Sequence, residues 1–101
     1  MKFDQSREIA ADEAKSIIRE IVADGVLIIS RHAKERMEER GYSLQDVIHI
    51  LLHGEIIKKE YKEATKNWSY KVQGYDLDND EGTVVVAIIK RMSAIVITVL
   101  G

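Results

Sequence analysis

Apolar residues in the first half of the chain recur at intervals of three and four positions, the spacing of amphipathic helices. A first helix is predicted to begin at Asp12, whose side chain can cap its start, and to end at Gly25, which suits a left-handed stop. Residues 1–11 show no strong period and are expected to form a loose lead-in. Residues 26–29 are apolar and mostly β-branched, which is consistent either with a strand or with a buried extended link.

Two further helices are predicted from their capping residues. Ser30 has the position of an N-cap for a helix that continues to Arg40 and is ended by a glycine. Ser43 precedes the next helix, and Asp46 at its third position completes an arrangement close to a capping box, although glutamate or glutamine is preferred there. This helix stops at Gly54, and four apolar side chains mark its inner face: Val47, Ile48, Leu51 and Leu52.

In the second half of the chain the pattern of apolar residues is typical of strands. A first strand is predicted at residues 56–61, and apolar and polar side chains alternate over residues 68–73 as in a half-buried antiparallel strand. Residues 76–82 are acidic and form a turn, while the strands at 83–91 and 94–100 are joined so briefly that they must form a hairpin. The chain is therefore expected to be an α+β protein, with N-terminal helices packed on a four-stranded, mainly antiparallel sheet.

The composition changes this picture by excluding several classes of protein. The chain has 101 residues, of which 46% are hydrophobic and 32% charged, so that residues 1–101 are expected to form a single domain with one core. The absence of cysteine excludes disulfides, thiolate metal sites and cysteine nucleophiles. Apolar runs fall far short of the roughly 20 residues of a membrane helix, and the charged N-terminus does not resemble a signal peptide. We therefore expect a soluble, cytoplasmic protein without membrane contact.

The segment that follows the apolar residues 26–29 has the most distinctive chemistry. On a helix, His32, Arg36 and Arg40 lie at positions i, i+4 and i+8 and share one face, where an imidazole and two guanidinium groups could contact phosphate. The start of the helix adds backbone amide donors and the positive end of a dipole. The net charge of −2 means that any RNA contact must come from such a local basic patch. The alternative is a solvated helix with ion pairs, because glutamates alternate with the cations: Glu35, Glu38 and Glu39.

Three other features each have a functional and a structural interpretation. The aspartates within residues 76–80 alternate as at the start of a calcium loop, but an acidic turn fits better because the template glycine is missing. His49 and His53 have a spacing able to hold zinc, yet no third ligand is apparent, so the edge of an amphipathic helix is the better interpretation. Trp68 could stack on a base, although a single tryptophan in a strand more often belongs to a core or an interface. No metal or other cofactor is predicted.

Motifs spread along the chain are Ser30 to Ala33, Arg36-Met37, Glu39 to Gly41, Asp46-Val47, Leu52, Gly54 to Ile56, Tyr70 to Val72, Gly74 and Ile97 to Val99. Together they resemble a small bacterial family called domain of unknown function 4258, which is grouped with RelE/ParE-like toxins. The resemblance covers roughly residues 27–100, and it is most specific in the second predicted helix. One departure is Leu100, where the family often has an aromatic residue.

This resemblance implies a RelE-like toxin fold and, by analogy with RelE-like and MqsR-like proteins, metal-independent cleavage of mRNA, in some cases on the ribosome. The partner would be a cognate antitoxin, and a homodimer is a further option. Such cleavage needs a base, an acid and cations that stabilise the developing charge. His32 is the candidate base, and Arg36 or Arg40 stabilises the charge. The candidates for an acid or for further RNA contacts are Tyr70, Lys71 and Lys90, and Arg31 is a further candidate for RNA binding.

Two of these RNA-binding candidates conflict with each other. Lys71 follows Tyr70 directly on a predicted strand, so the two side chains point to opposite faces and cannot easily serve one site. Packing within the sheet is the simpler role for Tyr70. The alternative function is a non-catalytic protein-interaction domain of the same fold, which the negative net charge favours.

Overall fold

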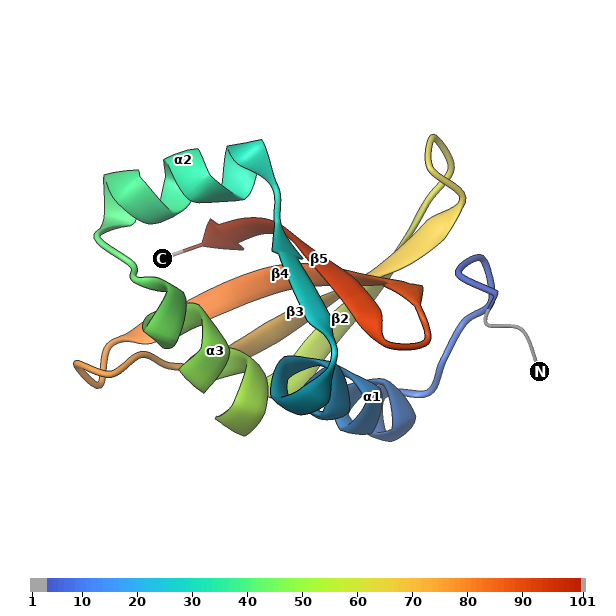
Figure 1. Ribbon diagram of the computed structural model, residues 1–101, viewed down its shortest axis with the longest axis horizontal. Helices are drawn as coiled ribbons and strands as arrows, with labels where there is room; N and C mark the ends of the chain where they lie inside the picture. Colours follow the sequence, from blue (N-terminus) through green and yellow to red (C-terminus); the bar gives the residue numbers. More distant parts are fainter. Residues whose placement is uncertain (1–3, 101) are drawn as a thin grey trace.

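The computed structural model describes residues 4–100, and its helices form where apolar spacing and capping residues coincide. The helices in this part of the chain are α1 (Ala11–Asp24), α2 (Arg31–Arg40) and α3 (Leu44–His53) (Figure 1). The Ser30 hydroxyl oxygen accepts a hydrogen bond from the Ala33 amide at 3.0 Å and so caps α2. Ser43 and Asp46 form a complete capping box at the start of α3. The starts predicted for these two helices are confirmed.

The ends of α1 differ from the prediction. Its N-cap is Ala10, which makes no side-chain hydrogen bond, while Asp12 lies inside the first turn, where its charge interacts favourably with the helix dipole. Gly25 ends the helix with extended backbone (φ −105°) in place of the expected left-handed conformation. Glycine is needed there for another reason, because a Cβ atom would collide with the carbonyl oxygen of Met92. The predicted cap at Asp12 and the left-handed stop at Gly25 are both wrong.

The sheet has one strand more than the sequence predicted. In residues 4–100 it contains five strands in the order β1-β5-β4-β3-β2, and the neighbours are antiparallel except for the parallel pair β1 and β5. The added strand is the apolar run whose interpretation was open, and it pairs through Val26 with Ser93 and through Ile29 with Val96. The expected four-stranded sheet is therefore a five-stranded mixed sheet. Its strands are β1 (Val26–Ile29), β2 (Glu55–Lys62), β3 (Asn67–Tyr75), β4 (Glu81–Lys90) and β5 (Ser93–Leu100).

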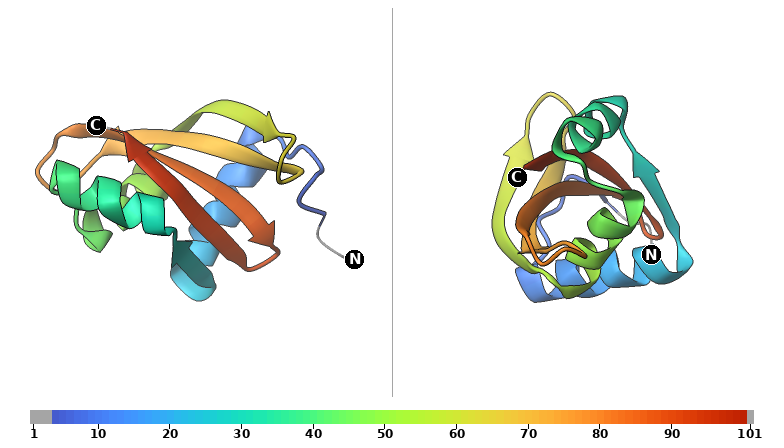
Figure 2. Two further views of the ribbon diagram at one scale, coloured as in Figure 1. Left: turned by 90° about the horizontal axis from the view of Figure 1, so that it is seen from above. Right: turned by 90° about the vertical axis from the view of Figure 1, so that its left-hand side faces the viewer.

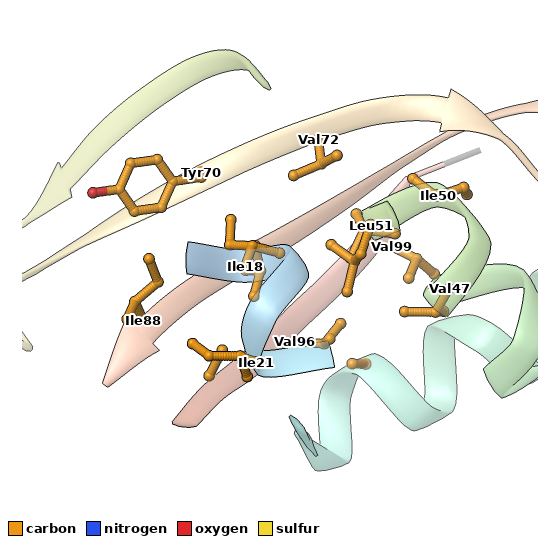
Figure 3. Packing of buried hydrophobic residues seen from close by; sticks show 14 of the residues in the cluster. Ile18, Ile21, Val47, Ile50, Leu51, Tyr70, Val72, Ile88, Val96 and Val99 are labelled. Carbon is orange, nitrogen blue, oxygen red and sulfur yellow. The ribbon is translucent and has the colours of Figure 1, made fainter. Parts of the chain in front are cut away.

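The core lies between one face of the twisted sheet and the helices. Ile18 and Ile21 of α1 point toward the strands from one side of this core, and Val47 and Leu51 of α3 from another (Figure 3). Helix α2 runs along β5 and contributes Ala33 and Met37. The strand residues of the same buried cluster alternate along β3 and β4, as expected for one face of a sheet, and on β5 the alternation is interrupted by an irregularity at Ile97. These strand residues are Tyr70, Val72, Val84, Val86, Ile88, Ala94, Val96 and Val99.

The segment before α1 is attached to the sheet. Residues 4–10 form neither helix nor strand, but the indole N–H of Trp68 donates a hydrogen bond to the Ser6 carbonyl at 3.0 Å. Of the expected loose lead-in, residues 1–3 lie outside the described part of the chain. None of the helices found in residues 4–100 is long and apolar enough to cross a bilayer.

Candidate functional site

Helix α2 places the three predicted catalytic side chains beside its buried face. Ala33 and Met37 are buried against β5, and the helical period puts His32, Arg36 and Arg40 together along one flank of that buried stripe. The side chains of His32 and Arg40 are exposed, and the side chain of Arg36 is 30% exposed. The predicted grouping on one face of α2 is thus present, and these three residues are called the basic stripe below.

The start of α2 is held in a fixed position against the sheet. The Ser30 hydroxyl donates a hydrogen bond to the carbonyl oxygen of Ile97 on β5 at 2.9 Å while it accepts one from the amide of Ala33. The amides of Arg31 and His32 precede the first intrahelical hydrogen bond of α2. His32 therefore extends from a rigid turn whose backbone donors and dipole favour a nearby anion.

Carboxylates flank the basic stripe on its solvent side. The Arg36 guanidinium lies 3.1 Å from the Glu39 carboxylate, in an ion pair that is partly open to solvent. A shallow, open hollow next to it is lined by Glu35, Glu38 and Glu39. Exposed ion pairs contribute at most about 1 kcal/mol, so Arg36 can exchange Glu39 for a phosphate at low cost. Of the ion pairs that the alternative interpretation expects, the described residues of α2 form this single one.

Tyr70 does not lie with the basic stripe. Its side chain is 1% exposed and belongs to the core, and Figure 3 shows its ring at the opposite end of the cluster from α2. Burial raises the pKa of the Tyr70 phenol, and a backbone hydrogen bond from Ile9 opposes this shift in part. Tyr70 is thus a core residue, in agreement with the simpler role given to it above.

The two lysines predicted to contact RNA lie elsewhere on the sheet. Lys71 extends from the face of β3 opposite to Tyr70 and lies directly across from Lys58 on β2. Lys90 is at the end of β4 and pairs with Ser93, which in turn pairs with Val26 at the beginning of β1. Helix α2 follows the other end of β1. The structure therefore does not bring Lys71 or Lys90 to the basic stripe, and Arg31 is the one RNA-binding candidate located on α2.

A second group of cations lies on the outer face of the sheet, where Lys71 alone was predicted to belong to a site. Lys58 and Lys62 both form ion pairs with Glu60, and Lys71 is a further cation near this carboxylate. The hydrogen bond that Glu60 accepts from Lys62 holds the pKa of Glu60 below its usual range. The positive charges of Lys58 and Lys71 also lower this pKa. The signal in the sequence was the alternation of charged residues along β2, which places them on one face.

The two segments with metal-like spacing make hydrogen bonds within the fold. Asp76 accepts hydrogen bonds from the amides of Asp78 and Asp80, at 2.9 Å each, and so closes an acidic turn. One ring nitrogen of His49 lies 2.7 Å from the carbonyl oxygen of Tyr75, and the ring of His53 is adjacent, with 4.6 Å between the ring centres. No group of three or more possible metal ligands occurs within the described range of 4–100.

One of three comparisons with known proteins gives a match, which covers the part of the chain that contains α2, α3 and the strands β2 to β5. The family described as Domain of unknown function (DUF4258) matches residues 29–100, which leaves out α1 and most of β1. No curated protein and no solved structure shows significant similarity to the chain. Because the match covers more than half of the sequence and includes the helix that carries His32, Arg36 and Arg40, the chain belongs to the domain of unknown function 4258 family.

Proposed function

We propose that this protein is the toxin of a bacterial toxin–antitoxin pair in the RelE/ParE-like superfamily, acting in the cytoplasm as a metal-independent mRNA endoribonuclease. The observation that carries the proposal is the basic stripe, in which one imidazole and two guanidinium groups lie on the same flank of α2 without being buried. A cognate antitoxin would control the activity by covering α2.

The chemistry assigned to the stripe is an attack within the RNA chain. His32 takes the proton of a 2′-hydroxyl, and the oxygen attacks the adjacent phosphorus while the bond to the 5′-oxygen breaks. Arg36 and Arg40 stabilise the negative charge that develops on the phosphoryl oxygens, since a planar guanidinium can donate two parallel hydrogen bonds to phosphate. The products are a 2′,3′-cyclic phosphate and a 5′-hydroxyl.

The leaving oxygen must be protonated without help from the sheet. Tyr70 is buried and Lys90 lies beyond the other end of β1, so neither supplies the acid. The protonated imidazole of His32, or water, fills this role in the proposal. Leu100, at the end of β5, offers no aromatic surface for stacking a base. A modest rate of cleavage is expected from so small a set of groups.

A second candidate function is supported by the acidic side of α2. Glu35, Glu38 and Glu39 surround a hollow next to the stripe and would repel an RNA backbone, while the net charge of the chain is −2. A non-catalytic domain that binds a partner protein with basic residues through α2 would account for this surface. The two functions predict opposite results in the same experiment.

The test is induction of the chain in a bacterial culture, with growth and transcript length as readouts. The wild type is expected to arrest growth and shorten transcripts, and His32→Ala and Arg36→Ala are expected to abolish both effects. The matched controls are His53→Ala on α3 and Arg91→Ala in the β4–β5 turn, which are exposed, lie outside the stripe and should remain toxic. Growth without arrest by the wild type would reject the nuclease. Equal toxicity of all variants would reject the assignment of residues.

A further inference from the structure

The two edges of the sheet differ in how they are protected. At one edge, β2 carries charged side chains on both faces and a bulge near Ile57, features that discourage pairing with another strand. At the other edge, β1 has four apolar residues and no charge, and the side chains of Val26 and Ile28 are 57% and 41% exposed. Figure 2 shows β1 at the rim of the fold, with no element beyond it.

The backbone of β1 has hydrogen-bonding groups directed away from β5. The amides of Val26 and Ser30 donate to the carbonyl oxygens of Met92 and Val96, so alternate residues of this segment bond toward β5. The N–H and C=O groups of Leu27 and Ile29 consequently point to the free edge. A strand that pairs with these two residues would satisfy four backbone groups.

We propose that a second copy of this chain pairs antiparallel with β1, on a two-fold axis that passes through Ile28. In this register the N–H and C=O groups of Leu27 both form hydrogen bonds with Ile29 of the second copy. By symmetry, Ile29 forms the same two hydrogen bonds with Leu27 of the second copy. Ile28 lies opposite Ile28 of the second copy in a non-hydrogen-bonded pair, where side chains approach most closely. The exposed side chains of Val26 and Ile28 become covered on the shared outer face.

The charges beside β1 fit an antiparallel copy of the same segment. Asp24 is the last residue of α1, just before β1 in the chain, and Arg31 and His32 are the first residues of α2, just after it. These three side chains are exposed and form no ion pair within the described residues. The axis through Ile28 brings Asp24 of each copy toward Arg31 and His32 of the other copy, which gives two equivalent contacts. A parallel arrangement would bring like charges together. This self-complementarity points to a second copy and not to an unrelated extended peptide.

Single cysteine variants test the register, because the natural chain contains no cysteine. Across a non-hydrogen-bonded pair the Cα atoms are about 4.5 Å apart, which lies within the range that a disulfide can span. Ile28→Cys is therefore expected to form a covalent dimer under mild oxidation. Val26→Cys is a matched control on the same face, because its two copies would be separated by about 13 Å along the strands. Ile57→Cys is the control on the β2 edge.

The expected result is cross-linking of Ile28→Cys at least about tenfold faster than of either control, as proximity would produce. Sedimentation should show a dimer for the wild type and a monomer for Ile28→Lys, with circular dichroism confirming that this exposed substitution leaves the fold intact. A wild-type monomer at all concentrations, or equal cross-linking rates for the three cysteine variants, would overturn the proposal. Neither outcome depends on RNA cleavage, so the dimer and the nuclease stand or fall separately.

Discussion

Asp46 joins two segments of the chain through one carboxylate, and its removal should have a large and pH-dependent effect. One oxygen accepts hydrogen bonds from the amide and hydroxyl of Ser43 at 2.8 and 3.0 Å, and the other accepts one from the amide of Leu77 at 3.0 Å. The residue is 7% exposed. Asp46→Ala therefore removes the carboxylate half of the capping box of α3 and the attachment of the acidic turn together, while the Ser43 hydroxyl still accepts from the backbone amide of residue 46.

The magnitude follows from the contacts that are lost. A hydrogen bond to a charged group contributes about 1.5–3 kcal/mol when water cannot replace it, and three such bonds to the carboxylate are lost. Because Ser43 and Leu77 are exposed, water replaces part of the loss, and we expect Asp46→Ala to lower the free energy of unfolding by roughly 2–3 kcal/mol. For a domain of this size that change lowers Tm by on the order of 10–20 °C.

The pH dependence gives a second, independent check. The hydrogen bonds from the backbone of Ser43 and Leu77 hold the pKa of Asp46 below its ordinary value, against the opposing effect of burial. The ionised form is therefore favoured in the folded state, and its contribution is complete above the unfolded pKa of about 3.9. As pH falls below that value and through the lower folded pKa, the contribution is lost. The difference in stability between wild type and Asp46→Ala should be full at pH 7 and smaller at pH 3.

Thermal unfolding followed by circular dichroism at pH 7, 5 and 3 measures both effects. The matched control is Asp78→Ala in the same acidic turn, where the side chain is exposed and accepts no hydrogen bond from residues 4–100, so that little change in Tm is expected. The reasoning is refuted if the two variants lower Tm equally at pH 7. It is also refuted if the deficit of Asp46→Ala grows as the pH falls.

Three further predictions concern residues outside the basic stripe. Gly25→Ala should lower Tm by several degrees in a melting experiment, because the new methyl group collides with a carbonyl oxygen of the β4–β5 turn, whereas an unchanged Tm would exclude this contact. Tyr70→Phe should leave growth arrest intact and alter stability by about 1 kcal/mol, as expected for a core phenol; loss of toxicity in a folded variant would place Tyr70 in the site. Trp68→Phe removes the hydrogen bond to Ser6, so limited proteolysis should cut residues 4–10 faster than in the wild type; equal rates would contradict the anchoring role.

Local signals explain which elements could be predicted from the sequence. The starts of α2 and α3 depend on Ser30 and Ser43, whose caps form within three residues of chain, so the prediction needed no knowledge of the fold. The strand β1 could not be assigned with certainty, because it is defined by pairing with residues more than sixty positions further along. The need for glycine at position 25 has the same kind of cause, because the atom that excludes a side chain there belongs to Met92.

In the candidate site, too, features that depend on local sequence could be predicted and features that depend on distant contacts could not. His32, Arg36 and Arg40 share a flank of α2 as the helical period requires, because this placement depends on a single element. Whether Tyr70 and Lys90 reach that flank depends on strand order, register and face, none of which is encoded within a short segment. Their separation from the stripe is therefore a property of the assembled sheet and not of any short segment.

The most direct test of the proposed function is cleavage of a defined single-stranded RNA by the purified chain, in the presence of a chelator, with mass analysis of the product ends. The account predicts fragments with 2′,3′-cyclic phosphate and 5′-hydroxyl ends, a rate at least about 100-fold lower for His32→Ala, and an unchanged rate for His53→Ala. Absence of cleavage by the folded wild type, or undiminished cleavage by His32→Ala, would contradict it.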